Sequence, residues 1–167
     1  SIAALLTTHV LVVMWALLAC VHAFSSQGVE PCALTTVTTP MKVTVDGTVV
    51  QRLNITVPNG TVAALTINAK NVVVKDVIIL HPSTGKGIDF SHADHLKISQ
   101  VEIRAYGTTS GPNPCPLPNN DCDNIHGYAS DGVVISNVRL EGGSTGIELD
   151  HSPGASVSRA AIRNARG

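Results

Sequence analysis

Side chains that can donate or accept protons gather between residues 123 and 150 of the chain. They fall in two groups, at residues 123–128 and 148–150, and apolar residues alternate with them. The candidates for catalysis are Asp123, His126, Tyr128, Glu148 and Asp150. A pair of carboxyl groups can act as acid and base on a glycosidic bond, whereas histidine and tyrosine can remove and return a proton. The residue types therefore predict acid–base chemistry, which requires that these side chains share one surface.

Apolar residues alternate with these candidates, as in a β-strand that has one face in the core. The pattern occurs in four similar units, which span residues 65–79, 88–103, 125–140 and 147–162. They recur at roughly 22 to 24 residues, apart from one long insertion, and such a period is typical of a solenoid. Each unit is too thin to bury its own apolar face, so the units must stack. We therefore expect an all-β fold, a parallel β-helix (solenoid) of about four to five coils.

Alignment of the four units predicts columns of residues that repeat from coil to coil. Three apolar columns are Leu65, Ile88, Ile125 and Ile147; Val77, Val101, Val138 and Ala160; and Val74, Ile98, Ile135 and Val157. A polar turn is expected at Asp76, Gln100, Asn137 and Arg159. A leucine-rich repeat has a similar period, but its leucine frame is absent here. An antiparallel sandwich remains an alternative, because it also alternates strands and turns.

Two further columns would face outward and hold the candidate site. One is Thr66, Asp89, His126 and Glu148, and the adjacent one is Asn68, Ser91, Tyr128 and Asp150. His92 and His151 lie just beyond them, and we expect Asp89, His92 and His151 to contact a substrate. Neighbouring strands are about 5 Å apart, so that carboxylates on adjacent coils would flank one sugar linkage. The alternative is an ordinary solvated face, since exposed strand positions are polar in any soluble β-protein.

The composition argues against several other classes of function. The formal net charge is −1, and no basic stretch is interleaved with aromatic residues, which argues against nucleic-acid binding. The glycine-rich segment 142–146 lacks the lysine of a phosphate-binding loop. No spacing of acidic and histidine residues is diagnostic of a metal site, so we expect no cofactor. Calcium that bridges an acidic sugar is left open as an alternative.

The N-terminal part of the chain has the features of a targeting segment. The apolar run Val10–Val21 is too short for a comfortable membrane span and is followed by small-residue cleavage chemistry at Ala23. We expect a signal peptide over residues 1–23, a secreted protein of the extracellular space or cell wall, and no membrane association after cleavage. A retained anchor is the alternative. The chain begins with Ser1, and we expect it to be a fragment of a longer helix. The sequons at Asn54 and Asn59 predict N-glycosylation.

The remainder divides into two regions. Residues 24–63 are expected to form N-terminal strands or a cap, and residues 64–167 the β-helix repeats, with a loop insertion at 106–122. Cys115 and Cys122 bracket a proline-rich part of this insertion, and we predict a disulfide between them. Zinc binding is less well supported, because their spacing matches no usual ligand pair. Cys32 is then unpaired, or it pairs outside this sequence.

The residues from about Asn71 to Leu149 resemble the central coils of polygalacturonases in the pectin-lyase-like superfamily. The resemblance is carried by NVVVKDVIIL, GIDFSHADHLKISQVEI and DNIHGYASDGVVISNVRLEGGSTGIEL. It implies a right-handed parallel β-helix that hydrolyses a uronan with a group of aspartates. The family motif Asn-Thr-Asp-Gly-Ile aligns with residues 121–125, where Asp123 and Ile125 keep the residue types. The family motif Gly-Asp-Asp-Cys aligns with residues 143–146, where Ser144 and Thr145 replace the aspartates.

The same superfamily contains lyases and mannuronan C5-epimerases, which abstract the proton at C5 of a uronate. Similarity to them implies roles for Tyr128, His126 and Asp123, with Arg104 and Lys97 nearby in sequence, and a substrate-binding role for Arg104. We therefore predict a β-helix that acts on an acidic polysaccharide by polygalacturonase-like hydrolysis. A lyase or epimerase is one alternative, and a noncatalytic glycan-binding or structural β-helix is another. Nothing in the sequence identifies a protein partner.

Overall fold

The computed structural model describes residues 33–58, 62–82, 84–106 and 122–163. These residues form only β-strands and their connections. The strands are β1 (Thr35–Val37), β2 (Met41–Val43), β3 (Val49–Thr56), β4 (Leu65–Ile67), β5 (Val73–Pro82), β6 (Ile88–Ser91), β7 (Lys97–Tyr106), β8 (Ile125–Tyr128), β9 (Val134–Glu141), β10 (Ile147–Asp150) and β11 (Ser156–Arg163). In these parts of the chain no helix is long and apolar enough to cross a membrane. The run Val10–Val21 lies outside them.

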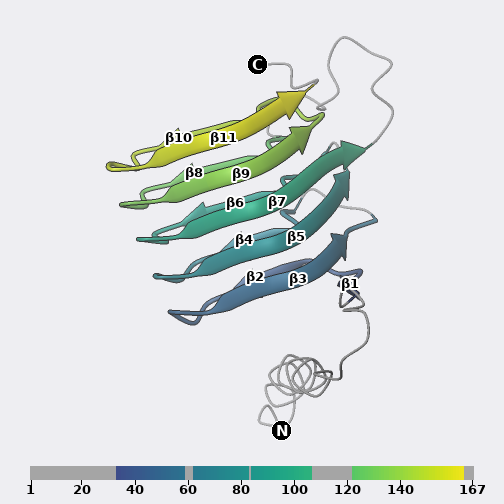
Figure 1. Ribbon diagram of the computed structural model, residues 1–167, viewed down its shortest axis with the longest axis horizontal. Helices are drawn as coiled ribbons and strands as arrows, with labels where there is room; N and C mark the ends of the chain where they lie inside the picture. The colour runs from purple at the N-terminus through teal and green to yellow at the C-terminus, as the bar shows by residue number, and fades with distance from the viewer. Residues whose placement is uncertain (1–32, 59–61, 83, 107–121, 164–167) are drawn as a thin grey trace, which may run out of the picture. The chain divides into compact units, whose positions relative to one another are not determined.

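The strands stack in two parallel sheets (Figure 1). From β2 onward, each coil gives a short strand to a five-stranded sheet, in the order β10-β8-β6-β4-β2. It then gives a longer strand to a six-stranded sheet, in the order β1-β3-β5-β7-β9-β11. All the pairings are parallel, as in β5 with β7 and β6 with β8. The parallel β-solenoid is therefore confirmed, and the antiparallel sandwich is excluded.

The N-terminal strands belong to the same stack. Strand β2 pairs with β4, and β3 pairs with β5, in the same two sheets as the later coils. The solenoid therefore includes the strands between residues 35 and 56, which lie within the region 24–63 where N-terminal strands or a cap were expected. Strand β1 adds an outer strand beside β3.

The predicted apolar columns are confirmed by the pairing register. Ile88 pairs with Leu65 and with Ile125, which in turn pairs with Ile147. Val77, Val101, Val138 and Ala160 pair in the same way along the six-stranded sheet. These side chains are buried in one continuous core, with the last coil more exposed than the coils before it. Stacking thus buries faces that no single coil could cover.

In one inward column a large residue pairs with a glycine on the next coil. Phe90 is among the largest fully buried side chains, and its partner on the next coil is Gly127. A Cβ atom placed on Gly127 would lie 2.2 Å from Cζ of Phe90. The phenyl ring therefore occupies the space that a side chain at position 127 would need. This packing also fixes the backbone between His126 and Tyr128, the two outward neighbours of Gly127.

A left-handed residue bends each long strand at the predicted polar turn. The φ angles are 53°, 54°, 53° and 52° at the four predicted residues, Asp76, Gln100, Asn137 and Arg159. Arg52, which was not among them, has a φ angle of 58° in β3. The strands continue through these residues, so the polar position is a bend within a strand rather than a break between two strands. In β5 the bend leaves Lys75 and Asp76 as consecutive residues that do not face the core, between buried Val74 and Val77. The regular alternation is shifted by one residue, as at a β-bulge.

Serine hydroxyls stabilise the turns after the short strands. The N–H of Ala93 donates to Oγ of Ser130 at 2.9 Å, and the N–H of Ser130 donates to Oγ of Ser152 at 3.4 Å. Each hydroxyl donates in turn to a carbonyl two residues earlier in its own coil. The turns are therefore linked from coil to coil through side chains, where the backbone leaves the strand geometry.

Candidate functional site

The predicted outward column on the five-stranded sheet is confirmed. His126 of β8 pairs with Asp89 of β6 on one side and with Glu148 of β10 on the other, and Asp89 pairs with Thr66. The residues that alternate with this column are buried in the core; they are Ile88, Phe90, Ile125 and Gly127. The residues between them therefore face outward. The local alternation of the sequence thus places an imidazole between two carboxylates.

Asp89 and His126 form a direct contact. Nδ1 of His126 lies 2.7 Å from Oδ1 of Asp89, and both side chains are partly buried. Nζ of Lys86 lies 3.4 Å from the same oxygen, with only 15% of its side chain exposed. When the carboxylate is ionised it only accepts hydrogen bonds, which assigns the proton to Nδ1 and leaves a lone pair on Nε2 of a neutral imidazole. A histidine held in this way is suited to act as a general base.

The adjacent column places a phenol beside two further imidazoles. Tyr128 pairs with Ser91 and with Asp150 on the neighbouring strands. Its ring lies edge-on to His151, with centroids 5.4 Å apart, and to His92 at 6.5 Å. Nδ1 of His151 lies 2.7 Å from Oδ1 of Asp150. Tyr128 is exposed, so its hydroxyl is accessible to a substrate on this face.

The structure therefore brings most of the predicted site residues together on one sheet. They come from β6, β8, β10 and the turns that follow β6 and β10, and we refer to them as the acid–histidine face. Its members are Asp89, His92, His126, Tyr128, Glu148, Asp150 and His151. Lys86 also reaches Asp89 but was not predicted. Its signal in the sequence was the spacing of three residues from Asp89, which brings the two side chains together in the turn before β6.

Asp123 is not part of the acid–histidine face. It precedes β8 and is 1% exposed, and its Oδ1 accepts a hydrogen bond from Oγ of Ser144 at 3.2 Å. The neighbouring Asn124 is also buried, and its Nδ2 donates to the carbonyl of Gly142 at 2.7 Å. Both residues lie at the corner between two strands, where the strand alternation does not apply.

Arg104 also lies away from the acid–histidine face. It is on β7 in the six-stranded sheet, whereas Asp89 and His126 are on the five-stranded sheet. Its guanidinium binds Glu102 through Nη2 at 2.5 Å and Nε at 2.7 Å, and it lies 4.0 Å from Glu141. Lys97 begins the same strand. Closeness in sequence to the site residues therefore does not bring these cations to the site.

A buried histidine that the sequence analysis did not single out lies at the end of β5. His81 is fully buried, with Nε2 3.3 Å from Oδ1 of Asn124 and Nδ1 3.0 Å from the carbonyl of Pro82. Burial lowers the pKa of His81, because the interior disfavours the imidazolium, although its hydrogen bonds act in the opposite direction. The contact of Nε2 with Asn124 joins the end of β5 to the corner before β8.

Several predictions fall wholly or partly outside the described residues. Cys122 is buried and disulfide-bonded, but Cys115 lies in the undescribed segment 107–121, so their pairing stays a prediction. Asn54 is a partly buried residue of β3, and Asn59 is not described. Within the described ranges, no three His, Cys, Asp or Glu side chains form a group that could hold a metal ion.

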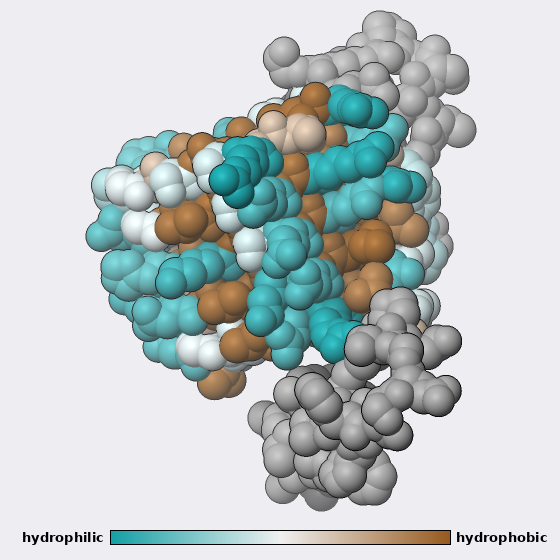
Figure 2. Space-filling view, in the orientation of Figure 1, coloured by the Kyte–Doolittle hydropathy of each residue, from teal (hydrophilic) through white to brown (hydrophobic). Residues whose placement is uncertain are grey.

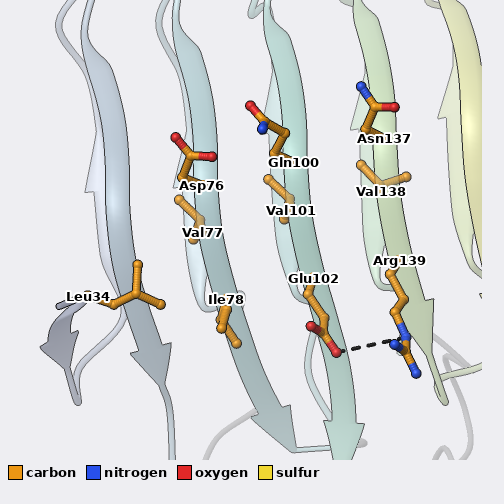
Figure 3. A pocket seen from close by; sticks show the side chains of 10 residues that line it. All are labelled: Leu34, Asp76, Val77, Ile78, Gln100, Val101, Glu102, Asn137, Val138 and Arg139. Carbon is orange, nitrogen blue, oxygen red and sulfur yellow. Dashed lines mark ion pairs between the residues drawn. The ribbon is translucent and has the colours of Figure 1, made fainter. Parts of the chain in front are cut away.

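A hollow of about 430 Å³ lies on the other sheet, lined by residues of β5, β7 and β9 (Figure 3). It does not coincide with the acid–histidine face, which we prefer as the candidate catalytic site because its chemistry is that of acids and bases.

No family model matches the chain, and neither the curated proteins nor the solved structures include a significant match. The function therefore has to be inferred from the chemistry of the two surfaces.

Proposed function

We propose that the acid–histidine face acts on an acidic polysaccharide by removing the proton at C5 of a uronate residue. The observation that carries this proposal is the 2.7 Å contact between Nδ1 of His126 and Oδ1 of Asp89. This contact orients the ring and stabilises the imidazolium that forms when Nε2 takes a proton. Nζ of Lys86 lies 3.4 Å from the same oxygen and brings a positive charge to the carboxylate of Asp89.

Tyr128 supplies the second proton-transfer group in the proposed reaction. Nε2 of His126 takes the C5 proton, and the electron pair forms a double bond between C4 and C5 as the C4–O bond breaks. The hydroxyl of Tyr128 then protonates the leaving oxygen, which gives an unsaturated product. In an epimerase the C4–O bond stays intact, and a proton returns to C5 from the opposite side. The two side chains lie two residues apart on one strand face, so both can reach one sugar.

Hydrolysis is the second candidate, and one observation favours it. Asp89 and Glu148 flank His126 on either side, two strand spacings apart. That separation is about 9.6 Å between backbones, close to the upper end of the carboxyl separation of about 6.5–9.5 Å in inverting glycosidases. The aspartate expected from the polygalacturonase resemblance, Asp123, is buried against Ser144. Hydrolysis on this face would therefore use Asp89 and Glu148.

The proposal also includes the setting of the reaction. Acidic polysaccharides are extracellular or cell-wall polymers, and the apolar run Val10–Val21 supports export. Glycosylation at Asn54 and Asn59, and a disulfide between Cys115 and Cys122, would be consistent with that location. The partner that we propose is the polysaccharide itself.

The test is to incubate the full chain with polygalacturonate, alginate and polymannuronate. Absorbance of unsaturated products, new reducing ends and proton exchange at C5 are measured in parallel. We expect unsaturation or C5 exchange with at least one polymer, and a loss of about 100-fold or more in the Asp89→Asn variant. The matched control is Asp46→Asn, which neutralises an exposed carboxyl group in a turn before β3.

The three readouts separate the candidate functions. Reducing ends without unsaturation or C5 exchange would contradict proton abstraction and support hydrolysis. Binding of a polymer with none of the three signals would contradict both enzymatic functions and leave a noncatalytic glycan-binding solenoid. An Asp89→Asn variant as active as Asp46→Asn would show that the acid–histidine face is not the active site.

A further inference from the structure

A second polar surface follows the bends of the long strands on the six-stranded sheet. The hollow of about 430 Å³ on this sheet falls within the range of about 300–1,000 Å³ that is usual for small-molecule sites. Asp76, Gln100 and Asn137 line it from three adjacent strands, at the same position of each coil (Figure 3). The hollow therefore crosses the strands and runs along the direction in which the coils stack.

The left-handed backbone makes these three side chains available to a ligand. Asp76, Gln100 and Asn137 have φ angles of 53–54°, and all three are exposed. Because each bend shifts the alternation by one residue, the side chain points outward while the next residue, a valine, returns to the core. The strands are about 4.8 Å apart, so a planar carboxyl or amide group is offered at that interval along the hollow.

A second row of lining residues contributes apolar and charged groups. Ile78, Glu102 and Arg139 are paired across β5, β7 and β9, and Nε of Arg139 lies 3.9 Å from Oε1 of Glu102. Leu34 adds an apolar side chain to the lining (Figure 3). The lining therefore has two carboxylates, one guanidinium and two amides, a charge balance that disfavours a polyanion. The face of the molecule shown in Figure 2 mixes hydrophilic and hydrophobic side chains.

We propose that this hollow binds a linear, neutral polysaccharide along the stacking direction, separately from the acid–histidine face. The carboxyl group of Asp76 and the amides of Gln100 and Asn137 bind hydroxyl groups of successive sugars. Each side chain offers two polar atoms in one plane, which suits neighbouring hydroxyls on a pyranose ring. Leu34 and Ile78 contact the apolar faces of the rings. The protein would thus be held on a neutral wall polymer while the other sheet faces an acidic one.

The test measures binding of neutral hexasaccharides of β-1,4-linked glucose, xylose and mannose by calorimetry. The variant Asp76→Gly/Gln100→Gly/Asn137→Gly removes all three side chains and keeps the fold, since glycine adopts positive φ without a steric cost. The matched control is Arg52→Gly/Arg159→Gly, which makes the same change at the same position of two coils outside the hollow. Thermal unfolding verifies that both variants are folded.

We expect at least one neutral hexasaccharide to bind the unaltered chain. Each lost hydrogen bond lowers the affinity roughly two- to tenfold, so the triple glycine variant should bind at least about tenfold more weakly. The Arg52→Gly/Arg159→Gly control and a Tyr128→Phe variant should bind as the unaltered chain does. Amide chemical shifts should change on β5, β7 and β9 and not on β6 and β8.

Three results would overturn the proposal. They are the absence of binding to all three neutral hexasaccharides, equal affinity of the triple glycine variant, and competition by a galacturonate oligosaccharide for the same shifted amides. None of them bears on catalysis by the acid–histidine face, because the tests of that face use acidic polymers and Asp89→Asn. The two proposals therefore fail independently.

Discussion

Replacing Gly127 with alanine tests the packing that places His126 and Tyr128 on the acid–histidine face. The added Cβ would lie 2.2 Å from Cζ and 2.4 Å from Cε2 of Phe90, well inside ordinary van der Waals contact. Phe90 is fully buried and cannot rotate into solvent. Overpacking of a core by one methyl group costs about 1–3 kcal/mol. Loss of the flexibility of glycine in the unfolded chain offsets about 0.4–1 kcal/mol of that.

We therefore expect Gly127→Ala to lower the free energy of unfolding by about 1–2 kcal/mol, measured by urea unfolding followed by circular dichroism. Phe90→Leu alone should also destabilise, by about 1–2 kcal/mol, because it leaves a void. In the double variant the new methyl group partly fills this void. The combined loss should therefore be smaller than the sum of the single losses by about 1 kcal/mol.

Two outcomes would refute this reasoning. One is a Gly127→Ala variant as stable as the unaltered chain, and the other is strict additivity of the two substitutions. Either result would mean that the phenyl ring does not occupy the space beside position 127. Activity on polyuronate should fall together with stability in Gly127→Ala, because the displaced strand carries both His126 and Tyr128.

Three further predictions concern stability. The free energy of unfolding should fall as the pH decreases below about 6.5, because the unfolded chain gains a proton at His81 while burial keeps the pKa of His81 in the folded state lower. His81→Gln should flatten this pH dependence. An unchanged slope in His81→Gln would contradict the role of His81. Gln100 has a φ angle of 54°, which is strained for a residue with a side chain, so Gln100→Gly should raise the free energy of unfolding by up to about 1 kcal/mol. Ser99→Gly, at an ordinary strand position, should lower the free energy of unfolding by about 0.5–1 kcal/mol. Ser130→Ala removes the acceptor for the N–H of Ala93 and should lower the free energy of unfolding by about 1–3 kcal/mol. Ser130→Thr keeps a hydroxyl group and should lower the free energy of unfolding less. Equal losses of stability in the two variants, measured by thermal unfolding, would argue against a stabilising role of this hydrogen bond.

The sequence was sufficient to predict the repeat, the strand faces and most of the acid–histidine face. Alternation along a strand fixes which side chains face outward, and stacking with a regular period fixes which of them become neighbours. Asp89, His126 and Glu148 therefore align as predicted, because each occupies the same place in its unit.

Residues at corners were harder to place. Asp123 and Asn124 precede β8, where the strand pattern has not begun, and both are buried by contacts with Ser144 and Gly142 from the next connection. Burial of a polar side chain at such a corner depends on hydrogen bonds that no local pattern reveals.

Arg104 shows that closeness in sequence does not predict which sheet a residue joins. It lies 15 positions after Asp89 of β6, which is enough chain to cross from one sheet to the other. The bends at Asp76, Gln100 and Asn137 were predicted as polar turns, but the continuation of the strand through them was not. Only the φ angles reveal that a single residue makes the bend.

The exchange of the C5 proton for deuterium tests the central claim most directly. Polygalacturonate and polymannuronate are incubated in D₂O with the unaltered chain, with His126→Gln, and with His95→Asn as a control at an exposed turn histidine. With the unaltered chain and with His95→Asn we predict deuterium at C5, or unsaturated product where the C4–O bond breaks. Both signals should be reduced by about 100-fold or more with His126→Gln. Loss of the C5 proton with His126→Gln at the rate of the unaltered chain would contradict proton abstraction by His126. So would the absence of both C5 exchange and unsaturated product with the unaltered chain.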